Sequence, residues 1–176
     1  EVQAERRPTR SISMARVRLS DGQELHAVND LFIGPRTHVS ARYTIQSGSQ
    51  RELHSSSGVI VSTGLGSTGW FRSLLTGALQ MTGVEGLNTL TALQSHGFPW
   101  EARHLYFTVR EPFPSRSTQA ELVFGKVDEQ HPLQLHSHMS DYGVIFSDGI
   151  EQDYLEFNAG MTAEISVAER IGVLVQ

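Results

Sequence analysis

The sequence predicts a mainly β protein: a two-layer antiparallel β-sandwich of many short strands, with one short helix after a glycine-rich loop. Three observations support this fold class. Apolar and polar residues alternate along many short segments, turn-forming residues separate these segments, and only one segment has the apolar spacing of a helix. Short strands at such regular intervals are typical of sandwiches and barrels.

The first part of the chain supplies about half of the predicted strands. Residues 1–10 are polar and include Pro8, so we expect a linker or tail there and a single domain over residues 11–176. The apolar alternation begins at Ser11, and Asp21-Gly22 is a hairpin signal. The strands expected before the glycine-rich loop are residues 11–19, 24–28, 31–33, 39–45, 51–54 and 59–62.

The one predicted helix covers residues 70–81. Phe71, Leu74, Leu75 and Leu79 follow helical spacing, and Gly83 is expected to end the helix. Residues 82–103 are rich in Gly, Thr, Ser and His, and we expect them to be irregular. The strands expected after them are residues 105–109, 121–124, 133–138, 143–146, 154–157, 163–167 and 171–175.

Composition excludes several classes of protein. The 176 residues are 39% hydrophobic and 19% charged, which is typical of a globular domain, and no stretch approaches the roughly 18 apolar residues of a membrane helix. The net charge of −5 argues against a general nucleic-acid binder. The absence of cysteine excludes disulfides, thiolate zinc sites and cysteine nucleophiles, and it is compatible with the cytoplasmic location that we expect.

A glycine-rich loop at residues 64–69 matches the pattern G-x-G-x-x-G between a predicted strand and the predicted helix. This context is that of a dinucleotide-binding Rossmann turn, and Glu85 lies about where a ribose-binding acid would follow. However, the chain lacks the strand–helix alternation of that fold. Two other interpretations stay open: a turn that serves packing only, or a loop that meets a nucleotide in another fold through backbone N–H groups and the hydroxyls of Ser62, Thr63, Ser67 and Thr68.

A polar pair, Asn29-Asp30, interrupts an apolar run between Val28 and Leu31. An asparagine amide can pair with the N6/N7 edge of adenine, and a neighbouring acid can accept two ribose hydroxyls. The alternative is an Asx turn that only ends a strand.

Two segments resemble the signatures of NAD kinases. Residues 26–34, His-Ala-Val-Asn-Asp-Leu-Phe-Ile-Gly, look like the Ala-Leu-Asn-Glu segment of that family. Residues 56–63, Ser-Ser-Gly-Val-Ile-Val-Ser-Thr, continued by residues 64–70, Gly-Leu-Gly-Ser-Thr-Gly-Trp, resemble its second signature. Residues 111–115 are similar to its Pro-His-Ser segment, and Asp148-Gly149 to its closing Asp-Gly. The glycine-rich loop is most similar to that of the mitochondrial-type branch.

The resemblance implies a role for each matching residue. Asn29 would contact adenine and Asp30 the ribose hydroxyls of NAD, while Thr68 and the backbone of Gly69 would line the same pocket. Trp70 takes the place of an aromatic residue that stacks on a base. The remaining members of the implied binding site are Ser73, one helical turn later, and Ser57, where many members have Asp.

The resemblance also implies a function: the C-terminal, NAD-binding and oligomerising domain of an ATP-dependent kinase that phosphorylates the ribose 2′-hydroxyl of NAD to give NADP. The N-terminal α/β domain of such kinases, with its phosphate loop, is not matched in residues 1–176, so ATP and Mg²⁺ are expected only for a longer parent protein. We expect this chain alone to be inactive and to form a homodimer or homotetramer, without a nucleic-acid or membrane partner. A non-catalytic assembly module, or a kinase of the same superfamily acting on a lipid or another hydroxyl compound, remains the alternative.

No metal site is expected from the sequence. His136 and His138 would share one face of a strand, but no third and fourth ligand is evident. Asp153 and Glu156 could neighbour Asp148, although a charged loop is the favoured interpretation of these residues.

Overall fold

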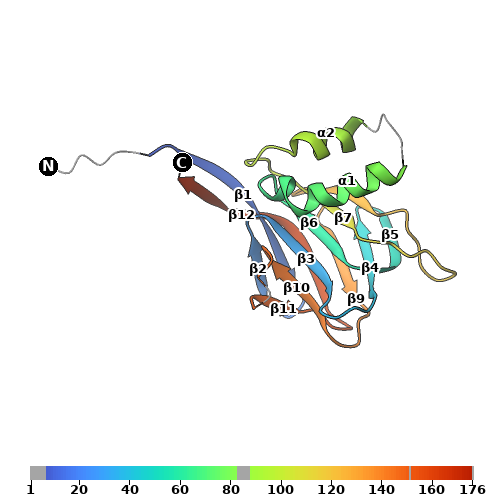
Figure 1. Cartoon of the computed structure of the whole chain (residues 1–176). Coiled ribbons are helices and arrows are strands. Elements are labelled where there is room, and N and C mark those ends of the chain that lie inside the picture. Colours follow the sequence, from blue (N-terminus) through green and yellow to red (C-terminus); the bar gives the residue numbers. More distant parts are fainter. Residues whose placement is uncertain (1–6, 83–87, 151, 176) are drawn as a thin grey trace.

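The computed structural model describes residues 7–82, 88–150 and 152–175, and it confirms the predicted two-layer β-sandwich (Figure 1). Each layer is a six-stranded sheet in which every paired strand is antiparallel to its neighbour. The first sheet has the order β2 (Glu24–Ala27), β1 (Thr9–Leu19), β12 (Thr162–Val175), β9 (Leu133–Ser137), β4 (Ala41–Ser47), β5 (Gln50–Ser56). The second has the order β11 (Tyr154–Glu156), β10 (Gly143–Ser147), β3 (Asp30–Pro35), β6 (Val59–Ser62), β7 (Leu105–Val109), β8 (Phe124–Val127).

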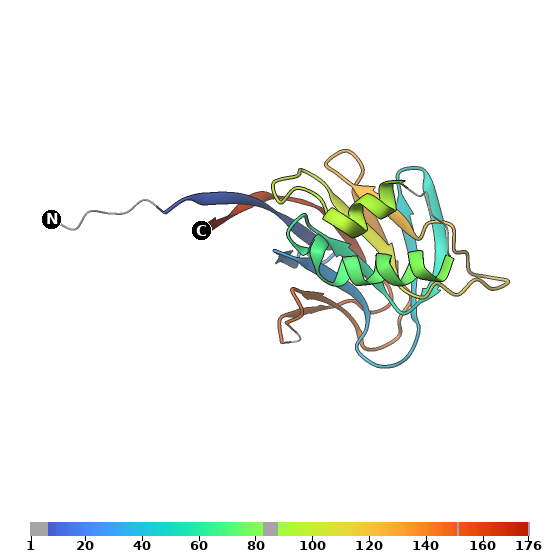
Figure 2. The same cartoon turned by 45° about the horizontal axis from the view of Figure 1, so that its top comes forward.

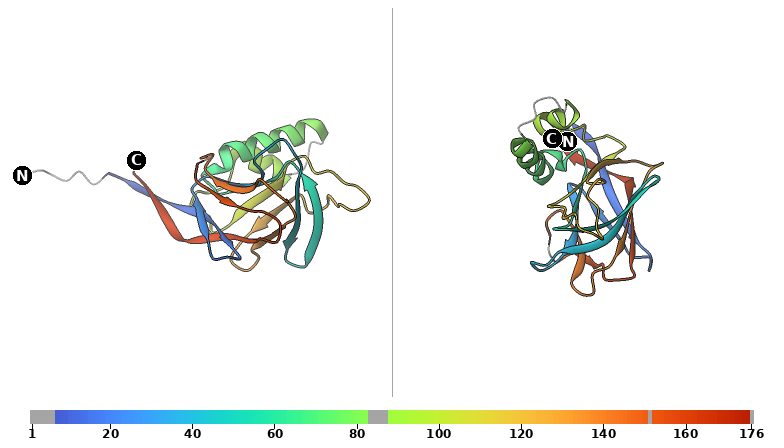
Figure 3. Two further views of the ribbon diagram at one scale, coloured as in Figure 1. Left: turned by 90° about the horizontal axis from the view of Figure 1, so that it is seen from below. Right: turned by 90° about the vertical axis from the view of Figure 1, so that its right-hand side faces the viewer.

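The main core fills the space between the two sheets, which Figure 3 shows from two further directions. Alternate residues of each strand point into it, as the period-2 pattern requires. Val17 of β1 and Ile165 of β12 come from the first sheet, and Leu31 and Ile33 of β3 come from the second; all four are fully buried. The side chain between the last two, Phe32, therefore faces the outside of the second sheet, which places it near the site described below.

A layer of helices covers part of that outer face (Figure 2). The glycine-rich loop forms a short 3-10 turn, η1 (Gly66–Thr68), and α1 (Trp70–Thr82) follows it. The predicted helix is thus confirmed, while Gly83 and Glu85 lie outside the described residues. Phe71 and Leu75 of α1 pack with Leu93 of a second helix, and Tyr106 and Phe124 of the sheet pack against this cluster.

The second helix, α2 (Asn88–His96), is missing from the prediction, which expected residues 82–103 to be irregular. Its sequence carries few apolar residues, and only Leu90 and Leu93 pack against α1 and the sheet. Tertiary packing, which a local pattern does not reveal, therefore stabilises α2.

Several strand boundaries also differ from the prediction. β1 begins at Thr9, and residues 163–167 and 171–175 belong to one continuous strand, β12. β8 begins at Phe124 because the backbone N–H groups of Glu121 and Leu122 donate to the side chain of Glu52 instead of to a neighbouring strand. The Rossmann interpretation is wrong, since the strands on either side of β6 are antiparallel to it.

β1 and β12 extend beyond the sandwich as a two-stranded arm (Figure 1). The arm pairs Thr9 with Val175, and the pairing shifts register between Ser13 and Ala15. Beyond the shift the apolar side chains of Ile171 and Val173 are 58% and 61% exposed. None of the helices in the described residues is long and apolar enough to cross a membrane.

Candidate functional site

The turn at Asn29 and Asp30 connects β2 to β3 and is held by one carboxylate. The backbone N–H groups of Val28, Asn29 and Asp30 donate to Asp148 at 2.9, 2.6 and 3.2 Å. Asp148 follows β10 in the left-handed region, at φ 53°, with Gly149 after it. The β10–β11 turn thereby fixes a segment more than a hundred residues earlier in the sequence.

The glycine-rich loop is tied to the same turn. The backbone N–H of Thr63 donates to the Asn29 carbonyl at 2.9 Å, and the Thr63 hydroxyl donates to the carbonyls of Val28 and Asn29 at 2.6 and 3.1 Å. A Cβ atom on Gly66 would lie 2.1 Å from the Asn29 carbonyl oxygen, so only glycine allows this approach. The two segments that carry the sequence resemblance therefore contact one another directly.

Most of the loop hydroxyls serve the fold. Ser62, Thr63 and Ser67 are fully buried, and each donates to a backbone carbonyl. Ser67 also accepts from the backbone N–H of Phe98 at 3.2 Å, which ties the loop to the segment after α2. Of the four hydroxyls proposed for ligand contact, only Thr68 is exposed.

These segments enclose an open pocket of about 350 Å³. Five of the seven residues predicted for the binding site line it: Asn29, Asp30, Thr68, Gly69 and Trp70. The other lining residues are Leu65, Gly66, Asp148 and Gly149. The sequence contained a signal for the last two, the Asp-Gly turn, but nothing local connected that turn with Asn29.

Asp30 is the chemically unusual member of the pocket. It is 9% exposed, and its carboxylate has no hydrogen-bond or ion-pair partner among the described residues. Burial, and secondarily the negative charge of Asp148, raise the pKa of Asp30 to about 6. A buried acceptor without a partner, with a perturbed pKa and facing a pocket, is typical of a binding or catalytic site.

An aromatic wall stands beside the pocket. Trp70, which is 38% exposed, stacks on Phe32 with ring centroids 5.7 Å apart and an interplanar angle of 17°. Phe32 in turn stacks on Phe146 at 5.6 Å, and the guanidinium of Arg110 lies 5.3 Å from the Trp70 ring centroid. The wall can therefore present a π face to a planar ligand.

Two predicted residues lie elsewhere. Ser73 is exposed on α1, where its hydroxyl donates to the Gly69 carbonyl at 3.5 Å, and it does not line the pocket. Ser57 lies in a second hollow at the opposite end of β3, where its hydroxyl donates to Glu111. The Pro-His-Ser-like segment beginning at Glu111 thus lies beside Ser57 and away from Asn29 and Asp30.

His136, in β9, and His138, just after β9, lie close together, as their spacing predicts. The rings of His136 and His138 lie 5.0 Å apart, and His138 and Thr44 share a hydrogen bond of 2.8 Å. Among the residues that the structure describes, no three His, Asp or Glu side chains gather to hold a metal ion.

No protein-family model matches the chain, and no curated protein matches its sequence. Its fold is similar to that of a solved structure, an NAD kinase from Archaeoglobus fulgidus in complex with ATP, with a TM-score of 0.61 and 15% sequence identity. The similarity covers 94% of this chain and 55% of the kinase chain, so this chain spans little more than half the length of that kinase. The β-sandwich with its helical layer is therefore an NAD kinase-like fold.

Proposed function

We propose that the chain is the substrate-binding domain of an NAD kinase-like phosphotransferase, and that the pocket at Asn29 and Asp30 holds the adenosine half of NAD. One observation carries the proposal. Asn29 and Asp30 meet Thr68, Gly69 and Trp70 around one hollow, although the two segments are separated by more than thirty residues.

Each side chain offers a distinct contact to an adenosine. The Asn29 amide can donate to and accept from the adenine edge, and the unpartnered carboxylate of Asp30 can accept hydrogen bonds from two ribose hydroxyls. Trp70 offers the exposed face on which a base can stack. Asp148 is already committed to three backbone N–H groups, so its role is to position Asn29 and Asp30.

Calorimetric titration with NAD tests this assignment, with ATP as a parallel ligand. The double variant Asn29→Ala, Asp30→Ala should weaken NAD binding at least tenfold. The control is Asp141→Ala, because Asp141 is exposed and its side chain has no partner among the described residues. NAD binding that is equally tight in the double variant and in the wild type would refute the site.

Phosphoryl transfer depends on positioning and charge neutralisation, and the proposed role of this domain is the positioning. The pocket does not fit a Mg²⁺ site, because Asp148 is engaged with backbone N–H groups and leaves Asp30 as the one free carboxylate among the residues that line it. We therefore assign the binding of ATP and Mg²⁺ to the α/β domain of a longer parent protein. The chain alone should form no NADP from NAD, ATP and Mg²⁺, and clear NADP formation would contradict this division.

A second candidate function, assembly of copies into a homodimer or homotetramer, is favoured by the arm. Ile171, Val173 and Val175 expose more than half of their surface there, which is a costly arrangement for a monomer in water. Light scattering after size exclusion should show an oligomer that Val173→Lys disrupts. Met81→Lys, at an 89% exposed position on α1, should leave it intact. A monomeric wild type would exclude this candidate.

A further inference from the structure

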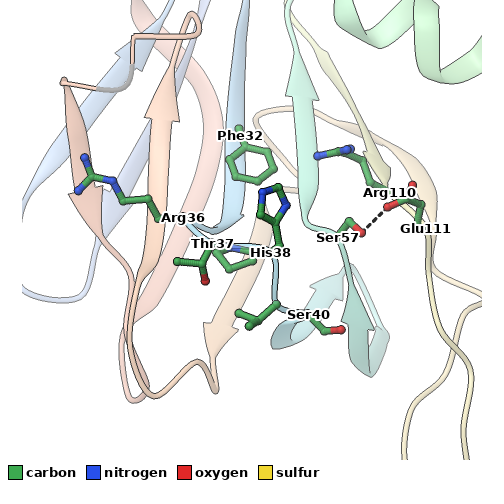
Figure 4. Close-up of a pocket in the computed structure, with 10 residues that line it drawn as sticks. Phe32, Arg36, Thr37, His38, Ser40, Ser57, Arg110 and Glu111 are labelled. Carbon is green, nitrogen blue, oxygen red and sulfur yellow. Dashed lines mark hydrogen bonds between the residues drawn. The ribbon is translucent and has the colours of Figure 1, made fainter.

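A second hollow lies at the opposite end of β3 from the nucleotide pocket and has a volume of about 460 Å³ (Figure 4). Phe32 forms one wall, and the loop of residues 36–40, Ser57, Arg110 and Glu111 form the others. This volume falls within the range of small-molecule binding sites. The proposed adenosine contacts of Asn29 and Asp30 do not use this hollow.

Arg110 is the residue in the hollow that the fold leaves unexplained. Among the residues that the structure describes, its buried Nε has no hydrogen-bond partner and its guanidinium forms no ion pair with a carboxylate. The described contacts of the guanidinium are with aromatic rings, 5.3 Å from the centroid of Trp70 and 6.0 Å from that of Phe32. A buried donor without an acceptor destabilises the folded state, so it calls for a missing partner.

The other polar groups leave that position open to an anion. Figure 4 shows the guanidinium of Arg110 and the ring of His38 pointing toward each other beside Phe32. Arg36 points away, and its guanidinium lies 4.7 Å from the Tyr154 ring centroid. Glu111, the one carboxylate that lines the hollow, accepts from the Ser57 hydroxyl and is exposed.

We propose that this hollow is a binding site for the oxyanion group, a phosphate or a carboxylate, of a small aromatic molecule. Arg110 is the primary anion contact, because a guanidinium offers N–H donors in the planar geometry that such groups accept. His38 supplies a further N–H donor, and Phe32 supplies the wall against which a ring packs. Arg110, His38 and Phe32 do not line the Asn29–Asp30 pocket, although Phe32 and Arg110 contact Trp70, which does. The anion contact proposed here makes no use of Asn29 or Asp30.

Titrations with phenyl phosphate, benzoate and inorganic phosphate, followed by NMR of the His38 ring, test the proposal. At least one probe should bind saturably, with a dissociation constant on the order of millimolar. Comparing phenyl phosphate with benzoate identifies which oxyanion the site prefers. Phenol, which has the ring without the anion, should bind at least tenfold more weakly than the better of the two.

Variants locate the site. Arg110→Gln should weaken binding at least tenfold and Arg110→Lys less, whereas Arg116→Gln, at an exposed arginine, should leave affinity within about twofold. The backbone bonds of Arg110, to Ser57 and Gly58, do not involve its side chain, and thermal unfolding checks that the variants fold. The Asn29→Ala, Asp30→Ala variant should bind the probe as the wild type does. Absence of saturable binding by every probe, or equal affinity in Arg110→Gln, overturns the proposal.

Discussion

Replacing Asp30 by asparagine should stabilise the folded protein at neutral pH while it weakens the proposed nucleotide binding. The Asp30 carboxylate has no partner among the described residues, and burial together with Asp148 raises its pKa from 3.8 to about 6. Each pKa unit corresponds to about 1.4 kcal/mol, so ionising this group in the folded state costs about 3 kcal/mol, reduced to about 2 by solvent in the open pocket. Asparagine keeps the shape of the side chain and the backbone bond to Asp148 without that cost.

The size of the effect depends on pH. The folded-state pKa of Asp30 is the raised one, so the contribution of Asp30 to the stability of the wild type is most favourable below pH 3.8 and becomes unfavourable as the pH rises toward about 6. The asparagine of the variant does not titrate. The difference in unfolding free energy between Asp30→Asn and the wild type should therefore grow with pH and become constant above about pH 6, and at pH 4.5 it should be about a third of its final value.

Urea and thermal denaturation followed by circular dichroism at pH 4.5, 6 and 7.5 measure this difference. At pH 7.5 we expect the melting temperature of the variant to exceed that of the wild type by about 5 °C. The matched control, Asp141→Asn at an exposed position, should change it by less than about 1 °C. A variant no more stable than the wild type at pH 7.5, or a difference of equal size at every pH, would refute the electrostatic account of this pocket.

Because the Asp30 carboxylate must be ionised to accept the ribose hydroxyls, NAD binding should weaken as the pH falls through about 6, by at most tenfold per pH unit. Titrations between pH 5 and 8 measure this. Glu52→Ala should cost about 3 kcal/mol or more by urea unfolding, because Glu52 accepts from the His54 ring at 2.8 Å and from the backbone N–H groups of Glu121 and Leu122 at 3.2 and 3.1 Å. Burial raises the pKa of Glu52, but these hydrogen bonds outweigh it and leave the pKa below 4.5, so the stabilisation should disappear as the pH falls below that value. Gly66→Ala should lower stability by about 2–3 kcal/mol, whereas Gly77→Ala, where a Cβ meets nothing within 4 Å, should not.

The sequence was sufficient for the parts of the site that are local in the chain. Alternation predicted the strands, and the Asn29-Asp30 pair and the loop before Trp70 were found because each is a contiguous segment. α2 escaped prediction because packing against α1 stabilises it more than its own pattern does. The role of Asp148 in holding the Asn29 turn was not predicted for another reason. Its hydrogen bonds to that turn join residues more than a hundred positions apart in the sequence.

The loop hydroxyls show the same limit at shorter range. The sequence alone does not distinguish among the four hydroxyl residues of the loop region, Ser62, Thr63, Ser67 and Thr68, because each has a hydroxyl that could face a ligand. The structure separates them, because the first three are buried against backbone carbonyls and only Thr68 is exposed. Burial depends on which residues approach the loop from elsewhere, and here these are Asn29 and Phe98.

The hydrogen bonds divide the pocket into residues that build it and residues left free to bind. Thr63, Gly66 and Asp148 hold the two segments together, so a substitution of any of them changes stability and affinity at once. Asp30 and Trp70 instead offer groups to a ligand: Asp30 has a carboxylate without a partner among the described residues, and Trp70 is partly exposed beside the pocket. A loss of NAD affinity in Asp30→Asn, accompanied by a gain in stability, cannot be attributed to unfolding. That combination distinguishes a binding residue from a structural one, and Asp30 is the position in this pocket where the two effects are expected to have opposite signs.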